Sequence, residues 1–230
     1  MKPLLSLPPD ALAGVLGGDG RAQAVYAVMR EGGDPFAPGV LAPGALKRLQ
    51  EHVTPTVLAI ETETVASDGT VKQRVRLFDG RAVEIVAIPT EDRTTLCVSS
   101  QVGCARACTF CETGRLGLKR QLDAGEMVDQ VRLARSIWTT RKPSAPPLQN
   151  VVFMGMGEPF DNLAAVLCAI RLLTDPRAFA LAPSRITVST VGVADKLDAF
   201  FAGSRAELAV SLNAPDDARR SAIMPVNQRV

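Results

Sequence analysis

The chain has 230 residues, of which 47% are hydrophobic, 22% are charged and 4% are aromatic, and its formal net charge is +2. These values exclude a disordered chain, and the length suffices for a sizeable core without disulfide bonds. No apolar run approaches the roughly 20 residues that span a bilayer, and Pro8, Pro9 and Asp10 interrupt the N-terminal segment, so we expect a cytoplasmic protein with no membrane partner.

The first fifty residues are typical of short helices separated by loops. Three amphipathic segments are candidates, at 7–16, 21–33 and 42–53. Asp10 stands near the start of the first, and Gly32 and Gly33 end the second. We therefore predict a small N-terminal helical domain over residues 1–54.

Residues 56–89 change to a strand pattern. Three β-type segments, 56–67, 70–78 and 81–89, are separated by the turn sequences SDG and FDG. Strand-like segments joined by such turn signals predict an antiparallel meander. We assign residues 55–90 to this linking segment.

After Thr94 the predicted strands alternate with helices. Strands are expected at 95–100, 150–156, 185–190 and 207–212, and helices at 124–138, 162–174 and 194–201. The Pro-rich stretch 142–150 is expected to be a surface connection. This alternation predicts an α/β core over residues 91–230 with a parallel sheet, either doubly wound or curled as a barrel. In both folds, the functional residues gather at the carboxyl ends of the strands.

Three of the five cysteines lie in one short loop. Cys104, Cys108 and Cys111 fall in GCARACTFCETG, directly after a predicted strand. A structural zinc site needs a fourth ligand, and the single histidine, His52, lies far upstream. Buried, unreactive cysteines are the other alternative, but Arg106 makes this segment a poor core element. Three thiolates fit a [4Fe–4S] cluster that keeps one iron open for a non-protein ligand.

The spacing CxxxCxxC, with Phe110 before the last cysteine, resembles the signature of radical S-adenosylmethionine (SAM) enzymes. The resemblance extends to CVSSQVGC, GLKRQL, VVFMGMGEPFDNL, RITVSTVGV and LAVSLNAPDDARRSAIMPVN, in this order. This series is similar to the RlmN/Cfr family of RNA adenine methyltransferases. The resemblance implies a partial (β/α) barrel of the radical SAM type, after the helical domain and the meander.

The resemblance also implies the chemistry. Family members methylate carbon 2 of an adenine in 23S rRNA and, in the RlmN branch, in tRNA. SAM binds the open iron of the cluster, and its reductive cleavage gives a 5′-deoxyadenosyl radical. A methylated cysteine carries the methyl group, and a second cysteine resolves the protein–RNA adduct through a transient disulfide. An external electron donor such as flavodoxin and a monomeric state are implied as well.

Site residues follow from the resemblance, position by position. Glu84 matches a catalytic proton acceptor and Cys97 the resolving cysteine, although on sequence alone an exposed strand face and a small buried residue explain them equally well. The positions that match SAM contacts are Gly157, Glu158, Ser189, Ser211, Leu212 and Asn213. An ordinary turn explains Gly157 but not Glu158. The other cysteine, Cys168, is expected to be core packing.

Several cations near the predicted site are candidates for phosphate contacts or for solvated surface: Arg115, Lys119, Arg120, Arg219, Arg220 and Arg229. The N-terminal helices resemble the domain that the family uses for RNA engagement.

Family members continue past the position of Val230 and carry the methyl-accepting cysteine there, whereas no cysteine follows Cys168 here. We therefore expect a chain that holds the cluster but does not complete methylation. Two other classes stay open: a different radical enzyme with the same cradle, and a metal-stabilised RNA-binding module without catalysis.

Overall fold

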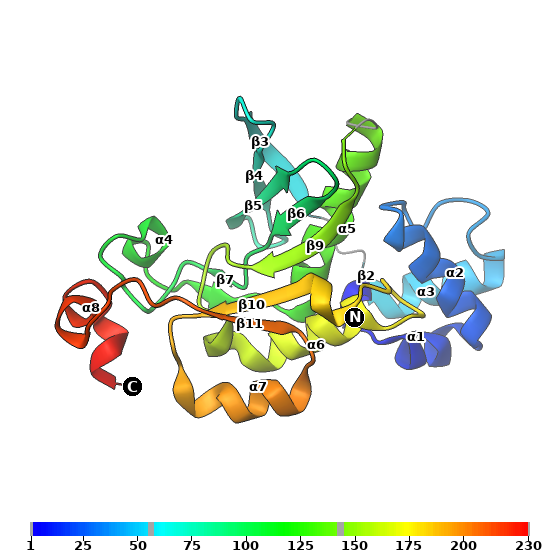
Figure 1. Cartoon of the computed structure of the whole chain (residues 1–230). Helices are drawn as coiled ribbons and strands as arrows, with labels where there is room; N and C mark the ends of the chain where they lie inside the picture. Colours follow the sequence, from blue (N-terminus) through cyan, green and yellow to red (C-terminus); the bar gives the residue numbers. More distant parts are fainter. Residues whose placement is uncertain (1, 55–57, 142–144, 230) are drawn as a thin grey trace.

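A seven-stranded sheet runs through the middle of the molecule (Figure 1). The computed structural model describes residues 2–54, 58–141 and 145–229. The N-terminal helices lie at one end of the sheet, and the short helices α4 and α8 lie at the opposite end (Figure 1). None of the described helices combines the length and the apolar character that a bilayer crossing demands.

The three predicted N-terminal helices are confirmed. They are α1 (Pro9–Leu16), α2 (Asp19–Arg30) and α3 (Pro43–His52). Proline occupies the first turn of α1 and α3, where no helical N–H bond is lost. A short parallel pair, β1 (Lys2–Pro3) and β2 (Val53–Thr54), brackets the three helices.

The predicted meander forms one half of the large sheet. Its strands β3 (Ala59–Val65), β4 (Val71–Arg76) and β5 (Ala82–Pro89) are antiparallel. The other half consists of the parallel strands β6 (Thr94–Cys97), β9 (Leu148–Phe153), β10 (Ile186–Thr190) and β11 (Glu207–Val210). Antiparallel pairing of β5 with β6 joins the halves, so the strand order is β11-β10-β9-β6-β5-β4-β3.

The predicted helices of the α/β core cover only one face of this sheet. They are α5 (Ala124–Arg141), α6 (Leu163–Thr174) and α7 (Leu197–Gly203). Burial alternates along β4 and β5, so every second side chain packs inward toward the helices. The mixed α/β class is confirmed. The sheet is open, and α5, α6 and α7 leave its other face without a layer of long helices.

Several short elements have no counterpart in the sequence prediction. They are β7 (Gln101–Val102), β8 (Arg120–Gln121), α4 (Glu112–Arg115), α8 (Asp217–Ile223) and the 3-10 helices η1 (Leu4–Ser6), η2 (Pro159–Asn162), η3 (Pro183–Arg185) and η5 (Pro225–Arg229). A further 3-10 helix, η4 (Ala194–Lys196), forms the first turn of the helix predicted at 194–201. Elements this short carry too few residues to display a period. Only α8 had a usable signal, because the Asp216 carboxylate caps it by accepting from the Arg219 N–H.

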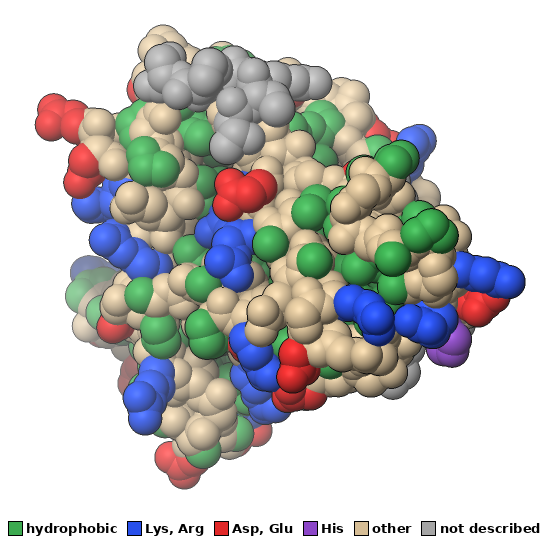
Figure 2. Space-filling model, turned by 90° about the vertical axis from the view of Figure 1, so that its right-hand side faces the viewer, with side chains coloured by type: hydrophobic (Ala, Val, Ile, Leu, Met, Phe, Trp, Pro, Cys, Tyr) green, Lys and Arg blue, Asp and Glu red, His purple; other side chains and the backbone are tan. Residues whose placement is uncertain are grey.

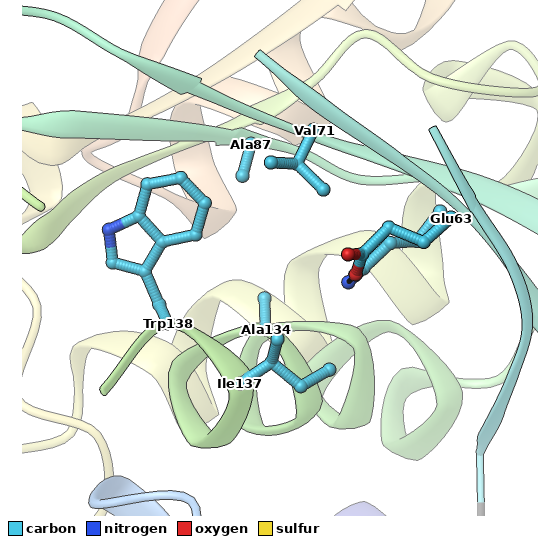
Figure 3. Close-up of a pocket in the computed structure, with 7 residues that line it drawn as sticks. Glu63, Val71, Ala87, Ala134, Ile137 and Trp138 are labelled. Carbon is cyan, nitrogen blue, oxygen red and sulfur yellow. Dashed lines mark hydrogen bonds between the residues drawn. The ribbon is translucent and has the colours of Figure 1, made fainter. Parts of the chain in front are cut away.

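One continuous hydrophobic core extends from Leu4 in the N-terminal segment to Ala206 before β11. Between α5 and the meander it leaves a cavity of about 20 Å³, where Trp138 and Ala134 of the helix face Val71 and Ala87 of the strands (Figure 3). A cavity of this size holds at most about one water molecule. It is therefore a packing defect and not a ligand site.

Candidate functional site

The cysteine loop begins at a neck that only glycine can form. Gly103 follows β7 with a φ of 77°, and a Cβ at this position would lie 1.9 Å from the Gly117 carbonyl oxygen. The antiparallel pairing of Val102 with Arg120 closes the neck, so the loop from Cys104 onward is held at both ends. The left-handed conformation and the close approach of the two backbones both exclude a side chain here.

The three thiols of this loop lie close to one another. Cys104 and Cys108 are buried and Cys111 is half-buried. Burial raises the pKa of the Cys104 thiol, and the charge of Glu158 adds to the shift. Burial also raises the pKa of Cys108, with Cys111 as the next contributor. The Cys104 and Cys108 thiols therefore hold their protons at neutral pH, and a metal centre has to displace these protons on binding.

Two contacts fix the loop from outside. The Arg106 guanidinium binds the Asp161 carboxylate through two hydrogen bonds, one of them 2.7 Å from Nε to Oδ2. On the other side, the Thr109 N–H donates to the Ile223 carbonyl oxygen at 2.9 Å, and Met224 and Val226 pack against Cys108. The loop therefore contacts η2 on one side and the segment that contains α8 and η5 on the other.

The turn after β9, GMGEP, packs against the strand that leads into the cysteine loop. The Ser100 and Gln101 N–H groups both donate to the Met156 carbonyl oxygen. Gly157 has a φ of 103°, and a Cβ there would lie 2.5 Å from the Gln101 Cβ. Packing against Gln101 alone therefore requires a glycine at this position, and the SAM contact of Gly157 stays a prediction.

Glu158 is only 2% exposed, and its carboxylate links the segments that follow β9 and β10. One oxygen accepts from the Phe160 N–H and the other from the Val191 N–H, both at 2.9 Å. Burial raises the pKa of this carboxyl, and the two backbone bonds oppose the rise. Each oxygen keeps a further lone pair, so a contact with the SAM ammonium group stays a prediction.

The polar residues after β10 and β11 meet at the same edge of the sheet. The hydroxyl groups of Ser189 and Ser211 lie 3.0 Å apart. Leu212 is exposed, and Asn213 has a φ of 59° with its amide donating to the Ser211 carbonyl oxygen at 3.3 Å. Strand register brings these residues together, because β10 and β11 are parallel neighbours.

Glu84 and Cys97 lie on the open face of the sheet, on adjacent strands. Cys97 pairs with Val86, which is two residues from Glu84 and therefore on the same face. The Glu84 carboxylate lies 3.2 Å from the Lys72 ammonium group, and the Ser99 hydroxyl donates to the Glu84 carbonyl oxygen at 2.7 Å. Burial raises the pKa of Cys97, so its thiol is protonated at neutral pH.

The predicted phosphate contacts are wrong for two of the arginines. Arg120 forms ion pairs with Asp79 and Glu126, and Arg220 is buried among carbonyl oxygens. Arg115 and Arg219 are exposed, but each is paired with an acidic residue of its own helix or cap. Lys119 is exposed, and the side chain of Arg229 lies outside the described residues.

Sequence reasoning missed the structural role of two residues that hold the site together, since Gln101 was not a candidate and Arg220 was one only as a phosphate contact or solvated surface. The Gln101 carboxamide accepts from the Glu158 N–H at 2.8 Å and donates to Gln121 at 2.9 Å. Arg220 donates to carbonyl oxygens after both β10 and β11. Gln101 could have been identified from its position between a strand and the cysteine loop. No sequence pattern indicates the contacts of Arg220.

The residues present fit a cluster with three thiolate ligands. The donor set is chemically suitable, and the thiols influence one another's pKa. Among the described residues, however, no group of three His, Cys, Asp or Glu side chains lies in a geometry that could already hold a metal ion. All five cysteines are free thiols. The free energy of forming iron–thiolate bonds is expected to draw the three sulfurs together.

Known proteins resemble this chain closely. A probable RNA methyltransferase from Sorangium cellulosum is 68% identical over 172 residues, which cover 75% of the chain and 43% of that protein. The dual-specificity RNA methyltransferase RlmN from Anaeromyxobacter dehalogenans is 43% identical and aligns with 98% of the chain and 63% of its own length. The chain thus spans about half of these curated relatives. No family model matches the chain.

A solved structure agrees with the sequence relatives. The crystal structure of a radical SAM methyltransferase from Sphaerobacter thermophilus superimposes with a TM-score of 0.88 at 36% identity. The match covers all of this chain and 69% of that protein. Together with the cysteine loop and the order of the strand-end motifs, these similarities show that the chain belongs to the RlmN-type family of radical SAM RNA methyltransferases.

Proposed function

We propose that this protein takes part in radical SAM methylation of carbon 2 of adenine in RNA. One observation carries the proposal: the cysteine loop, the GMGEP turn and the ends of β10 and β11 meet at the carboxyl edge of the parallel strands, beside an open sheet face. The Arg106–Asp161 ion pair and the hydrogen bond between Gln101 and Glu158 support this arrangement. Ligands bind at this edge in α/β folds.

The proposed ligand sets are separate and adjacent. Cys104, Cys108 and Cys111 hold a [4Fe–4S] cluster. Backbone and side-chain groups of Gly157, Glu158, Ser189, Ser211, Leu212 and Asn213 hold SAM. When bound, the cluster and SAM would supply a 5′-deoxyadenosyl radical. A radical route avoids an ordinary methyl displacement, which would fail at an electrophilic ring carbon.

Glu84 and Cys97 are proposed to act on the adduct with the base. The Glu84 carboxylate accepts a proton at Oε1 or Oε2, and the Lys72 ammonium group lies 3.2 Å from it. Cys97 carries a protonated thiol, so it has to lose that proton before its sulfur bonds to the carrier cysteine's sulfur in the adduct, a step in which that sulfur's bond to the transferred carbon breaks and the carbon stays on the base. Their common face and adjacent strands support a shared role.

The substrates and the setting are proposed from the relatives. They are 23S rRNA and tRNA, with an external one-electron donor such as flavodoxin and a monomeric, cytoplasmic protein. The printed names of the relatives support RNA methylation, and dual specificity is said of the RlmN proteins.

Anaerobic reconstitution with iron and sulfide tests the proposal. The chain is expected to bind about four irons, to show the broad cluster absorption and to form 5′-deoxyadenosine from SAM under a strong reductant. Cys104→Ala, Cys108→Ala and Cys111→Ala should each lose iron. Cys168→Ala is the matched control, because Cys168 lies on α6 away from the loop, and should keep iron.

Binding of one zinc ion without SAM cleavage would contradict the enzyme and favour an RNA-binding module. A second variant joins this chain to the part of the Sorangium cellulosum relative that lies beyond the matched residues. Formation of deoxyadenosine without RNA methylation by this fusion would favour a different radical enzyme.

A further inference from the structure

Strand β4 presents three cations on one face, and an aromatic ring follows in the turn after it. Lys72, Arg74, Arg76 and Phe78 are exposed, and the residues between them are buried. Because side chains alternate along a strand, the three cations point the same way, about 6.8 Å apart from one to the next. Arg74 pairs in register with Glu84, so the stripe lies beside the proposed catalytic carboxylate.

The cations of this stripe are accessible to a polyanion. Lys72 pairs with Glu84 at 3.2 Å and Arg74 with Glu61 at 3.3 Å, and all four side chains keep a substantial exposed fraction. Exposed pairs of this kind contribute little free energy, so a phosphate group readily replaces the carboxylate. For Arg76 no ion pair is found among the described residues.

Phe78 is 77% exposed, and backbone hydrogen bonds hold the segment around it. It sits in a tight turn in which the Leu77 N–H donates to the Arg81 carbonyl oxygen at 2.7 Å and the Gly80 N–H to Leu77 at 3.1 Å. The Arg120 guanidinium lies 5.1 Å from the ring centroid and covers one side of it. A ring with one side supported and the other in solvent is suited to stacking.

Two carboxylates hold the Arg120 side chain that covers one side of the Phe78 ring. Arg120 binds both oxygens of the buried Glu126 and one oxygen of Asp79, each at 2.7 Å. The hydrogen bond from Arg120 holds the pKa of the Asp79 carboxyl well below its usual range. Arg120 also pairs across the ribbon with Val102, directly before the neck of the cysteine loop. The stripe therefore ends at the rim of the proposed active site.

The N-terminal helices offer no comparable feature near the site. On their side of the molecule, Lys and Arg side chains are scattered among hydrophobic and uncharged ones (Figure 2). These helices also lie at the end of the sheet opposite to α4 (Figure 1).

We propose that Lys72, Arg74, Arg76 and Phe78 form a binding track for an unpaired RNA segment that flanks the target adenine. The cations contact successive phosphates, and Phe78 stacks on an unpaired base. This inference rests on the proposed function, because it takes RNA as the substrate. A single strand is chosen because bases in a duplex cannot reach an aromatic face.

A fluorescent oligonucleotide tests the track. The probe is a single-stranded RNA with 2-aminopurine at one position, titrated against the full chain. Wild type is expected to quench the 2-aminopurine emission at the stacked position. Phe78→Ala should abolish the quenching and weaken binding roughly 5- to 150-fold, the effect of losing one stacked base. Phe78→Tyr should restore both. Phe201→Ala, which removes another ring 60% exposed on α7, should change neither.

Arg76 is tested through salt dependence. Arg76→Gln should reduce the slope of log K against log salt by about 0.7, the value for one phosphate contact on a single strand, and Arg76→Lys should keep it. An unchanged slope, or unchanged affinity of Phe78→Ala, overturns the track.

The test separates this inference from the proposed function. SAM cleavage by the reconstituted protein needs no RNA, so its failure counts against the proposed function alone. Binding of poly-glutamate as tight as that of the RNA would identify a general anion surface and overturn the track.

Discussion

Arg220 is a buried cation that ties together the ends of two parallel strands. It is 8% exposed, and its guanidinium donates to the carbonyl oxygens of Val191 and Leu212 and to the Asn227 side chain. These bonds join the segments after β10 and β11 to η5, and all three acceptors are partly buried. The residue therefore positions the loops that are proposed to hold SAM.

Replacement of Arg220 by methionine should destabilise the protein by about 1–3 kcal/mol, because three partly buried acceptors lose their donor. Urea unfolding followed by far-UV circular dichroism measures this free energy. Arg219→Met is the matched control on the same helix, since Arg219 is exposed and paired only with Asp216. It should change the free energy of unfolding by less than about 0.5 kcal/mol. Equal effects of the two substitutions would contradict the role given to Arg220.

At the scale of elements, the ribbon of β7 and β8 sets the entrance to the cysteine loop. Each strand has only two residues, and their pairing depends on the backbones of Gly103 and Gly117 passing within a side chain's width. The loop therefore depends on a short ribbon whose geometry allows no Cβ at one position.

Gly103→Ala should open the neck of the loop. Its Cβ would lie 1.9 Å from the Gly117 carbonyl oxygen, and its φ of 77° is unfavourable for alanine. We expect loss of iron retention after reconstitution and a lower Tm. Gly117→Ala has a similar φ of 63° but no atom within 4 Å of its Cβ, so it should cost only about 1 kcal/mol and keep iron. If Gly103→Ala retained a full iron content, the neck would not be needed for the cluster.

The strands and helices with a clear period were predictable, and the pairing between distant segments was not. Residues 70–78 and 81–89 are rich in β-branched residues and are separated by the turn sequence FDG, so β4 and β5 follow from the sequence. Nothing local indicates that β5 pairs with β6, because this contact joins two segments that were predicted as separate parts. The same holds for Arg106 and Asp161, whose ion pair depends on the packing of two loops.

For the candidate site, the cysteine loop was found from spacing, whereas its supports were not. Gln101 and Arg220 act through backbone groups of distant residues, and no spacing rule describes such contacts. The roles of Glu84 and Cys97 came from resemblance. Their position on one face of adjacent strands adds a physical reason to expect that they work together.

At the scale of the molecule, the N-terminal helices and the sheet share one hydrophobic core. Arg30 of α2 donates to the Ala178 carbonyl oxygen at 2.6 Å, and Arg177 forms an ion pair with Asp10 of α1. Residues 1–54 were predicted to form a domain of their own. Their packing against α5 and the segment after α6 favours cooperative unfolding with the rest of the chain.

Leu12→Ala should therefore lower the stability of the whole molecule. Leu12 is fully buried in α1, and loss of its side chain is expected to cost about 2–5 kcal/mol. The single tryptophan, Trp138, reports on α5, and circular dichroism reports on all helices. Both signals should shift to the same lower urea midpoint. A shift in circular dichroism without a shift in Trp138 fluorescence would show that residues 1–54 unfold separately. Lys47→Ala, at an exposed position of α3, serves as the control.

The continuous sheet also restricts how the sequence can change in evolution. Glu84 and Cys97 share a face only because Val86 pairs with Cys97. An insertion or deletion of one residue inside β5 or β6 would turn one of the two side chains toward the helices. A length change in the connecting turn, where the Thr90 N–H donates to Arg93, leaves the register intact. Homologues should therefore vary in length at this turn and keep the strand segments on either side of it at constant length.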